Sequence, residues 1–393
     1  MPSRPWLVVA ALLWSALLVV GCSQPTPAAA PTSAGSSSGG GQPTAAPAAA
    51  MTSAPAAAAN PAGTSAPAAA APGKPLGKVI IAQPSQSLSF SPVLIADKKG
   101  YFKDAGLDVE VVNAGSGSKA AAAVIGGSAQ VGASDLGDMV GAAEKGQDVK
   151  IFAALVSRPT VTIVLRKSVA DRLGLTDQTP IDQRIKALKG LKMSISTPGS
   201  GTDVMLRYLL SAYGVDPERD LEILTTGSVV NSLAAYAQGA ADGASLSSPS
   251  TETAVLQNDA IFLVRPSTGE VPALKDQLQT GIWASGKWLN DNPEMATGVV
   301  VAIWRAMDYM RQNSADAAEL VRQEAWKDTD QKVFDLAWQD NLPTLPETPA
   351  VSLDGLKGLI TYIGVTEKRQ VNITPEALAT TAVFERAKAQ LGR

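Results

Sequence analysis

The hydrophobic and polar positions of residues 189–213 predict a strand, a turn and a helix in succession. Apolar residues first alternate with polar ones, which is the period of a short half-buried strand, at Leu191, Met193 and Ile195. The strand pattern ends at Pro198-Gly199, and Ser200, three residues before Asp203, gives a capping-box-like start to a helix. Apolar residues then recur at helical spacing before a natural stop at Gly214, at Met205, Tyr208, Leu209 and Ala212.

A turn of this kind places backbone N–H groups and hydroxyls beside the positive end of a helix dipole. We therefore expect the turn at Pro198–Thr202 to be a candidate seat for an anion or a polar ligand. The alternative is an ordinary strand-to-helix connection that binds nothing.

Residues 77–265 alternate predicted strands with predicted helices in two sets. The first set has strand patterns at residues 78–83, 107–112, 130–133, 149–156 and 161–165. The second set has strand patterns at residues 191–196, 221–225, 242–246 and 261–265. Such alternation predicts doubly wound, largely parallel sheets, and a short sequence echo between residues 127–134 and 239–245 indicates two similar lobes. From Gly281 onward the pattern is mostly helical.

The N-terminus has the pattern of a secreted protein. Arg4 precedes an apolar run at residues 6–20, which is shorter than the roughly 20 residues of a membrane-spanning helix. The run ends in Val19-Val20-Gly21-Cys22, which resembles the bacterial lipobox, whose cysteine is lipidated and becomes the mature N-terminus. Residues 1–22 are thus expected to be a lipoprotein signal peptide with lipidation at Cys22; the alternative is an incidental or buried cysteine.

Residues 23–76 are almost entirely Ala, Pro, Ser, Thr and Gly, with Lys74 as their one charge. This composition has too little large apolar surface to offset chain entropy, so we expect a disordered linker. A random coil of this length reaches roughly 40 Å, enough to hold a folded body away from a membrane surface.

Composition narrows the possible chemistry. The chain has no histidine and one cysteine, which excludes histidine-based catalytic triads, histidine-ligated metals and cysteine zinc sites. Its net charge of -3 disfavours nucleic acid as a partner. The spacings of the phosphate loop, the dinucleotide fingerprint and the nucleophile elbow are missing. Asp135 with Asp138 forms a possible carboxylate pair, for which a solvated or capping role is the alternative.

Five stretches of the chain follow one another in a characteristic order: SPVLIADKKGYFKDAGLDV at residues 91–109, IGGSAQVGAS at 125–134, LKGLKMSISTPGSG at 188–201, YAQGAADG at 236–243 and NPE at 292–294. In series they resemble the substrate-binding proteins of ABC importers. The resemblance is to the nitrate/sulfonate/taurine-like branch, which also includes binders of a thiamine pyrimidine precursor.

The resemblance implies an α/β protein with the two-lobed periplasmic-binding-protein fold of type II, each lobe a doubly wound sheet, and a helical C-terminal segment. It implies a first lobe at residues 77–165, a second lobe at 166–264 and a return to the first lobe at 265–393, with crossings near residues 165–167 and 264–266. Ligand contacts are expected at the strand ends that face the cleft. Carried over by position, these are Ser85, Gln86, Phe90, Ser116, Gly117, Ser134, Asp135, Ser200, Gly201, Thr202, Ser228 and Ser248.

The implied function is that of a membrane-anchored extracytoplasmic solute receptor. It would capture a small polar or anionic organic solute (sulfonate-, nitrate-, taurine- or pyrimidine-like) by lobe closure and deliver it to an ABC permease with its ATPase. A monomer is expected, without cofactor, metal, nucleic acid or catalysis. Two alternatives remain: an enzyme that uses carboxylate or lysine chemistry in the cleft, and a sensory lipoprotein with the same fold.

Overall fold

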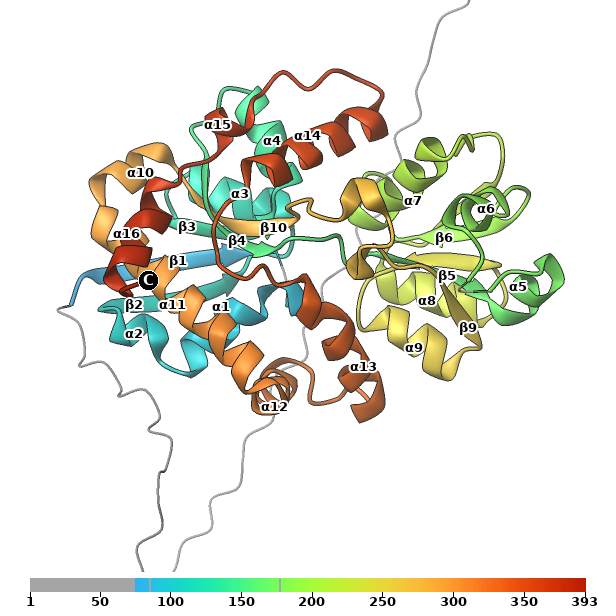
Figure 1. The fold of residues 1–393 in the computed structure, drawn as a ribbon, viewed down its shortest axis with the longest axis horizontal. Helices are drawn as coiled ribbons and strands as arrows, with labels where there is room; N and C mark the ends of the chain where they lie inside the picture. Colours follow the sequence, from blue (N-terminus) through green and yellow to red (C-terminus); the bar gives the residue numbers. More distant parts are fainter. Residues whose placement is uncertain (1–74, 85, 177) are drawn as a thin grey trace, which may run out of the picture. The chain divides into compact units, whose positions relative to one another are not determined.

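The computed structural model describes residues 75–84, 86–176 and 178–393 (Figure 1). The expected signal peptide with Cys22, residues 23–74 of the expected linker, and Ser85 lie outside the described residues. Among the described helices, none combines the length and the apolar character that crossing a bilayer requires.

The first sheet has five strands in the order β2-β1-β3-β10-β4. Their bounds are Gly77–Gln83 (β1), Leu107–Asn113 (β2), Val131–Asp135 (β3), Lys150–Val156 (β4) and Thr280–Ala284 (β10). Strand β1 is parallel to β2 and β3, whereas β10 is antiparallel to both β3 and β4. The sheet is therefore mixed, and the last of its strands in the chain enters it next to β3.

The second sheet repeats this plan in the order β7-β6-β8-β5-β9. Its strands are Thr162–Arg166 (β5), Lys192–Ile195 (β6), Glu222–Thr225 (β7), Gly243–Leu246 (β8) and Ala260–Val264 (β9). Strand β6 is parallel to β7 and β8, and β5 is antiparallel to β8 and β9. The second sheet thus takes all five strands from one stretch of chain, whereas the first sheet holds four strands that precede this stretch and a fifth, β10, that follows it.

The pairing of β5 corrects the expected position of the first crossing between the lobes. The sequence pattern placed the strand at 161–165 in the first lobe, but β5 pairs only with strands of the second sheet. The chain therefore crosses at residues 157–161, before β5, rather than near residues 165–167. The return crossing occupies residues 265–279, between β9 and β10. Both sheets are also mixed rather than largely parallel, because a strand that has just crossed runs against its new neighbours.

Helices cover the two sheets (Figure 1). In chain order they are Ser91–Lys98 (α1), Tyr101–Asp104 (α2), Gly117–Ile125 (α3), Gly137–Glu144 (α4), Lys167–Leu173 (α5), Ile181–Lys186 (α6), Gly201–Ala212 (α7), Val229–Ala237 (α8) and Ser250–Gln257 (α9). After β9 they are Gly286–Asp291 (α10), Pro293–Gln312 (α11), Ser314–Ala325 (α12), Gln331–Asn341 (α13), Leu353–Glu367 (α14), Pro375–Leu378 (α15) and Ala382–Gln390 (α16). Short 3-10 turns lie at Leu88–Phe90, Pro266–Thr268, Pro272–Leu274 and Leu342–Thr344.

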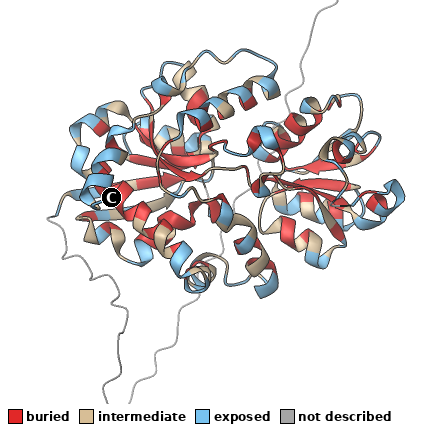
Figure 2. Cartoon of the chain, viewed as in Figure 1, coloured by how far each residue is buried: buried red, intermediate tan, exposed pale blue. Residues whose placement is uncertain are grey.

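Burial is concentrated in the strands and on the inner faces of the helices (Figure 2). The long helix α11 buries an apolar face against α1 and α16 in the first lobe. Helix α14 instead contacts both α4 of the first lobe and α7 of the second. Its position brings the C-terminal segment to the space between the two sheets.

Candidate functional site

A cavity of about 620 Å³ lies between the turns that follow the strands of the two sheets. The first lobe contributes the start of α3, the end of β3, the start of α4 and residues 277–279, and the second lobe contributes the turn between β6 and α7. Helix α14 forms a further wall. Strand ends at such a junction are where α/β proteins bind ligands on general grounds, so this cavity is the candidate site.

The turn between β6 and α7 is held by its own side chains. Ser200 is the N-cap of α7, and its hydroxyl accepts a hydrogen bond from the backbone N–H of Asp203. The hydroxyl oxygens of Ser196, Ser200 and Thr202 lie 2.8–2.9 Å from one another. Such a closed triangle fixes the shape of the turn and leaves its hydroxyls already partnered.

The Asp203 carboxylate also stabilises this turn. Its side chain is 4% exposed, accepts a 2.8 Å hydrogen bond from the N–H of Gly199 and pairs with Arg207 at 2.6 Å. A carboxylate in the first turn of a helix also offsets the positive end of its dipole. The turn therefore satisfies part of its own anion-binding capacity before any ligand arrives.

Two carboxylates face the cavity from the first lobe. Asp135 ends β3 and accepts a 2.8 Å hydrogen bond from the N–H of Gly137, with the Gln279 side chain as a second partner. Burial outweighs these bonds and raises the pKa of Asp135 to about 6. Asp138 lies three residues after Asp135, in the first turn of α4, where burial also raises its pKa above the ordinary value.

Gly117 makes room for the second of these carboxylates. A Cβ atom at this position would lie 2.1 Å from Oδ2 of Asp138. The residue before it, Ser116, is the N-cap of α3 and accepts a hydrogen bond from the N–H of Lys119. The missing side chain at residue 117 thus leaves the Asp138 carboxylate its place beside the start of α3.

Helix α14 supplies the apolar wall. Tyr362 is 8% exposed, and its ring lies 4.6 Å, centroid to centroid, from that of Tyr208 on α7. Burial raises the pKa of Tyr362 well above its ordinary value, so it is a neutral phenol at physiological pH. Further apolar side chains of the wall come from both lobes: Leu359, Ile363, Val161, Val204 and Met205.

Gln277 is positioned by α14. Gly355, in the first turn of that helix, approaches residues 276–278 so closely that a Cβ atom would lie 2.8 Å from the carbonyl oxygen of Asp276. The Gln277 side chain is 3% exposed and lines the cavity, and its Oε1 has no hydrogen-bond partner among the described residues. A buried amide oxygen without a partner costs free energy, which a ligand with a suitable donor would recover.

Five of the residues expected from the sequence line this cavity: Ser116, Gly117, Asp135, Ser200 and Gly201. Two others lie directly behind it. The Thr202 hydroxyl accepts from the N–H of Ser196, and the Ser134 hydroxyl accepts from Nε1 of the buried Trp283.

The remaining expected residues lie elsewhere in the structure. Gln86 and Phe90 line a different cavity, of about 170 Å³, beside Trp326. Ser228 is the N-cap of α8, and the hydroxyl of Ser248 is bonded to Glu252 and to Asn341 of α13. Ser85 lies outside the described residues.

Sequence reasoning did not identify the contributions of the return segment. Gln277, Gln279 and Tyr362 follow the second lobe in the chain, and the patterns used were those of strands followed by turns. One signal was present: apolar residues recur at helical spacing through α14, at Leu356, Leu359, Ile360 and Ile363. That period predicts a packed helix, although not the surface on which it packs.

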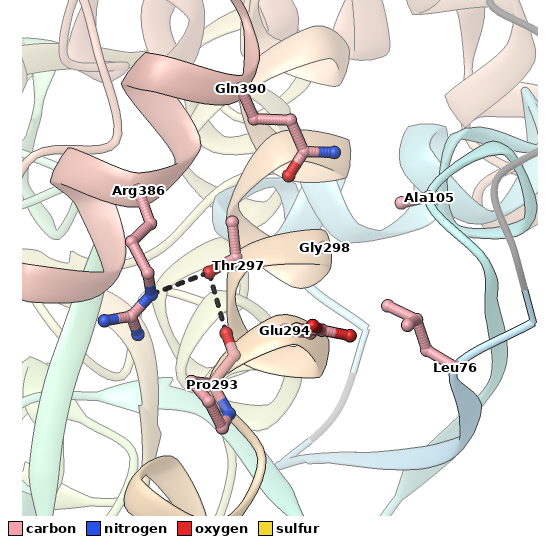
Figure 3. Close-up of a pocket in the computed structure, with 8 residues that line it drawn as sticks. All are labelled: Leu76, Ala105, Pro293, Glu294, Thr297, Gly298, Arg386 and Gln390. Atoms are coloured by element: carbon pink, nitrogen blue, oxygen red, sulfur yellow. Dashed lines mark hydrogen bonds between the residues drawn. The ribbon is translucent and has the colours of Figure 1, made fainter.

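A second cavity of about 480 Å³ lies on the first lobe among the start of β1, the end of α2, α11 and α16 (Figure 3). Its polar groups are used locally: Nε of Arg386 donates to the hydroxyl of Thr297, which donates to the carbonyl of Pro293. No residue of the second lobe lines it. The cavity between the sheets is therefore the better candidate.

Two α/β sheets joined by two crossings of the chain, with a cavity between them, define the class of two-lobed periplasmic binding proteins. The chain belongs to the NMT1-like family, whose model matches residues 86–323. The expected fold and the expected family are both confirmed.

Three curated relatives illustrate the similarity. The binding protein YtlA of Bacillus subtilis is 25% identical over 267 residues, which cover 66% of this chain and 74% of the relative. The nitrate/nitrite binding protein NrtA of a Nostoc strain is 28% identical, over 64% of this chain and 57% of the relative. The bicarbonate-binding protein CmpA of Synechococcus elongatus is 27% identical, over 59% and 53%. The chain thus spans little more than half the length of the two cyanobacterial relatives.

Solved structures share the fold. The alkanesulfonate-binding protein SsuA from Xanthomonas axonopodis, bound to MOPS, superposes with a TM-score of 0.59 at 16% identity, over 79% of this chain and 99% of that one. The periplasmic nitrate-binding protein NrtA from Synechocystis gives a TM-score of 0.57 at 17% identity, over 82% and 90%. At these identities the likeness establishes the fold alone.

Proposed function

We propose that this protein is the solute-binding component of an ABC importer and that its solute binds in the cavity between the two sheets. The observation that carries the proposal is the lining of that cavity, to which turns of both lobes and helix α14 all contribute. A ligand there would touch both lobes at once and would therefore stabilise their closed arrangement. Family membership and the names of the relatives support this assignment.

Within the cavity we propose direct solute contacts for Ser116, Gly117, Asp135, Ser200 and Gly201. Residues 157–161 and 265–279, which connect the sheets, would act as the hinge. The solute would leave unchanged, since the relatives are named as binding proteins and the proposal requires no chemical step. Delivery would be to a membrane permease driven by its ATPase, with the receptor acting as a monomer without a cofactor.

Membrane attachment is the second part of the proposal. Lipidation of Cys22 and a linker of residues 23–76 would hold the folded body at the outer face of the cell membrane. Replacing Cys22 with alanine in the full chain should move the protein from the membrane fraction to the soluble fraction. Retention of the variant in the membrane fraction would count against the lipid anchor.

A thermal-shift screen of the full chain tests solute binding. The solutes would include nitrate, bicarbonate, sulfonates, carboxylates, amines and pyrimidines, each at several concentrations. A solute at 100 times its Kd adds about 2.7 kcal/mol to the free energy of unfolding, which gives a clear rise in Tm. Mass spectrometry of the recovered solute would show whether it is unchanged.

A matched pair of variants locates the binding. Gly201 borders the cavity and Gly141 lies on α4 with open space around it, so Gly201→Phe fills the cavity and Gly141→Phe does not. A solute that shifts the Tm of the wild type and of Gly141→Phe, but not that of Gly201→Phe, supports the proposal. Conversion of the solute, or silence of every solute class, would overturn it.

A further inference from the structure

The charge of the cavity differs from what an anion would require. Three carboxylates line it, those of Asp135, Asp138 and Glu367, and none of its described lining residues is lysine or arginine. Glu367 is paired with Arg369, which also pairs with Glu144, so one guanidinium serves both carboxylates. Neither aspartate takes part in an ion pair among the described residues. Two carboxylates of the free protein therefore face the cavity without a counter-charge.

The turn at Ser200 does not offset the negative charge of the cavity. The N–H of Gly199 is bonded to the Asp203 carboxylate, and the Ser200 hydroxyl lies within the hydroxyl triangle. A small anion placed there would meet the negative field of Asp135, which lines the same cavity, while Asp203, paired with Arg207, already uses the N–H of Gly199. Repulsion of this kind, in a site partly removed from water, disfavours nitrate, bicarbonate and sulfonate groups.

Gln277 is an independent indication of the ligand. Its Oε1 is a buried acceptor that lacks a partner among the described residues, in a side chain that is 3% exposed and lines the cavity. Such an atom requires a hydrogen-bond donor. Nitrate and sulfonate groups have acceptors only and do not meet this need, whereas a protonated nitrogen does.

The remaining surface indicates that the cation is organic. The described residues include no group of three or more acidic side chains arranged as metal ligands. The apolar part of the lining includes the ring of Tyr362, which suits the body of a small organic molecule. The cavity, at about 620 Å³, accommodates such a molecule.

We propose that the cavity binds a small organic cation, a protonated amine or amidine, with its N–H groups directed to Asp135, Asp138 and Oε1 of Gln277. The body of the molecule packs on Tyr362 and its aliphatic neighbours. This inference rests on the proposed solute-binding function and specifies the chemical class of the solute. It replaces the expectation of an anionic solute.

Isothermal titration of the full chain at pH 7.5 tests the charge of the solute directly. The probes are two cations, benzamidine and tyramine, and their carboxylate counterparts, benzoate and 4-hydroxyphenylacetate. The pairs have similar shapes and opposite charges. We expect at least one cation to bind, and to bind more tightly than its carboxylate counterpart. Tighter binding of the carboxylates would overturn the inference and leave solute binding intact, whereas failure of both sets, with silence in the wider screen, would overturn both.

Carboxylate-to-amide variants identify the partners of the cation. Loss of a hydrogen bond to a charged group costs about tenfold or more in affinity, so Asp135→Asn and Asp138→Asn should each weaken cation binding by at least that factor. Asp328→Asn, at an exposed turn between α12 and α13, is the matched control and should bind as the wild type. Equal affinity of all three variants would contradict the assignment.

Gln277→Leu separates a ligand contact from a structural role. Removing an unpartnered buried amide should raise the Tm of the free protein, because the cost of burying the polar group is removed. The same variant should bind the cation more weakly, because the acceptor is lost. A variant that is less stable, with unchanged affinity, would show that Gln277 serves the fold instead.

The pH dependence gives a readout that a purely structural role would not show. A cation requires ionised Asp135, whose pKa of about 6 leaves about a tenth of the free protein ionised at pH 5 and nearly all of it at pH 7.5. Affinity should therefore rise about tenfold over this range, and Asp135→Asn should remove most of the rise. The titratable groups that interact with Asp135 are Asp138 of α4 and Tyr362 of α14; Tyr362 in turn interacts with Tyr208 and Asp203 of α7, and Glu367 of α14 lines the same cavity. An affinity that falls as pH rises would contradict the proposal.

Discussion

Glu252 on α9 provides a direct test of how the second lobe is held together. Its side chain is buried, with the residue 1% exposed. Oε1 accepts a 2.7 Å hydrogen bond from Ser248, while Oε2 has no partner among the described residues. Burial raises the pKa of Glu252 to about 7; Asp340 adds to the rise, whereas the Ser248 bond and Arg265 oppose it. The fold therefore favours the protonated form of this carboxyl.

The size of the effect follows from the two pKa values. Between an ordinary pKa of 4.5 and a folded-state pKa of about 7, ionisation costs the folded state about 3 kcal/mol. Because the folded state binds this proton more tightly than the unfolded state, the protonated Glu252 contributes about 3 kcal/mol to the free energy of unfolding, and this contribution is fully present below pH 4.5. The contribution is lost progressively as the pH rises from 4.5 through 7, and the free energy of unfolding changes little from this cause at higher pH. Glu252→Gln keeps a neutral side chain of the same shape at every pH and removes this loss.

Urea unfolding of the wild type and of Glu252→Gln at pH 5 and pH 8 measures the difference. Far-UV circular dichroism is the suitable signal, because residues 162–264 contain no tryptophan. Between these pH values the free energy of unfolding of the wild type should fall by about 2–3 kcal/mol more than that of the variant. The exposed Glu385→Gln serves as control and should follow the wild type. Parallel losses in the wild type and Glu252→Gln would refute the argument from burial.

Three further substitutions test close approaches and a buried charge pair. Gly132→Ala would place a Cβ atom 2.3 Å from the buried ring of Trp283, so we expect a loss of about 1–3 kcal/mol in urea unfolding; wild-type stability would contradict this packing. Gly117→Ala displaces only the flexible Asp138 carboxylate, so titration should show weaker benzamidine binding while the free energy of unfolding changes by less than about 0.5 kcal/mol. Arg184→Met removes the 2.6 Å ion pair with Glu270 and leaves that carboxylate with the backbone N–H of Arg265 as its partner, so we expect the free energy of unfolding to fall by about 3 kcal/mol, a loss that 0.5 M salt does not reproduce in the wild type.

The local elements followed from the sequence because each has a local physical cause. The alternation in residues 191–196 gave β6, and the cap at Ser200 with helical spacing after it gave α7. Strand β10 was missed: its five residues are all buried, so no polar position alternates with the apolar ones, and it follows two 3-10 turns. A short, wholly buried segment shows no period that separates a strand from a helix.

The sheet that β5 joins could not be predicted from the periodicity of the sequence. Strand β5 follows β4 after a short connection, and neighbouring strands in the chain usually pair with each other. Its partners, β8 and β9, lie about a hundred residues further along the chain, and nothing in the residues of β5 specifies them. The expected crossing at residues 165–167 was therefore wrong by one strand, while the two-lobed plan was confirmed.

In the candidate site too, the parts with a local sequence pattern were predicted and the parts that depend on distant contacts were not. The turns at Ser116, Asp135 and Ser200 were identified because each follows a strand of its own sheet. The residues that complete the cavity come from distant parts of the chain: Gln277 is held by Gly355, and Tyr362 contacts the second lobe through Tyr208.

The expectation of a polar or anionic solute came from the hydroxyl-rich turns and from the resemblance to nitrate and sulfonate binders. The glycine, serine and threonine of such a turn favour an anion at a helix start, yet Asp203 three residues later already occupies the N–H of Gly199. The fold places a solute at the strand ends but does not fix its charge, which depends on a few side chains there. Here those side chains are Asp135 and Asp138, and a chain that shares its fold with anion receptors therefore has a cavity suited to a cation.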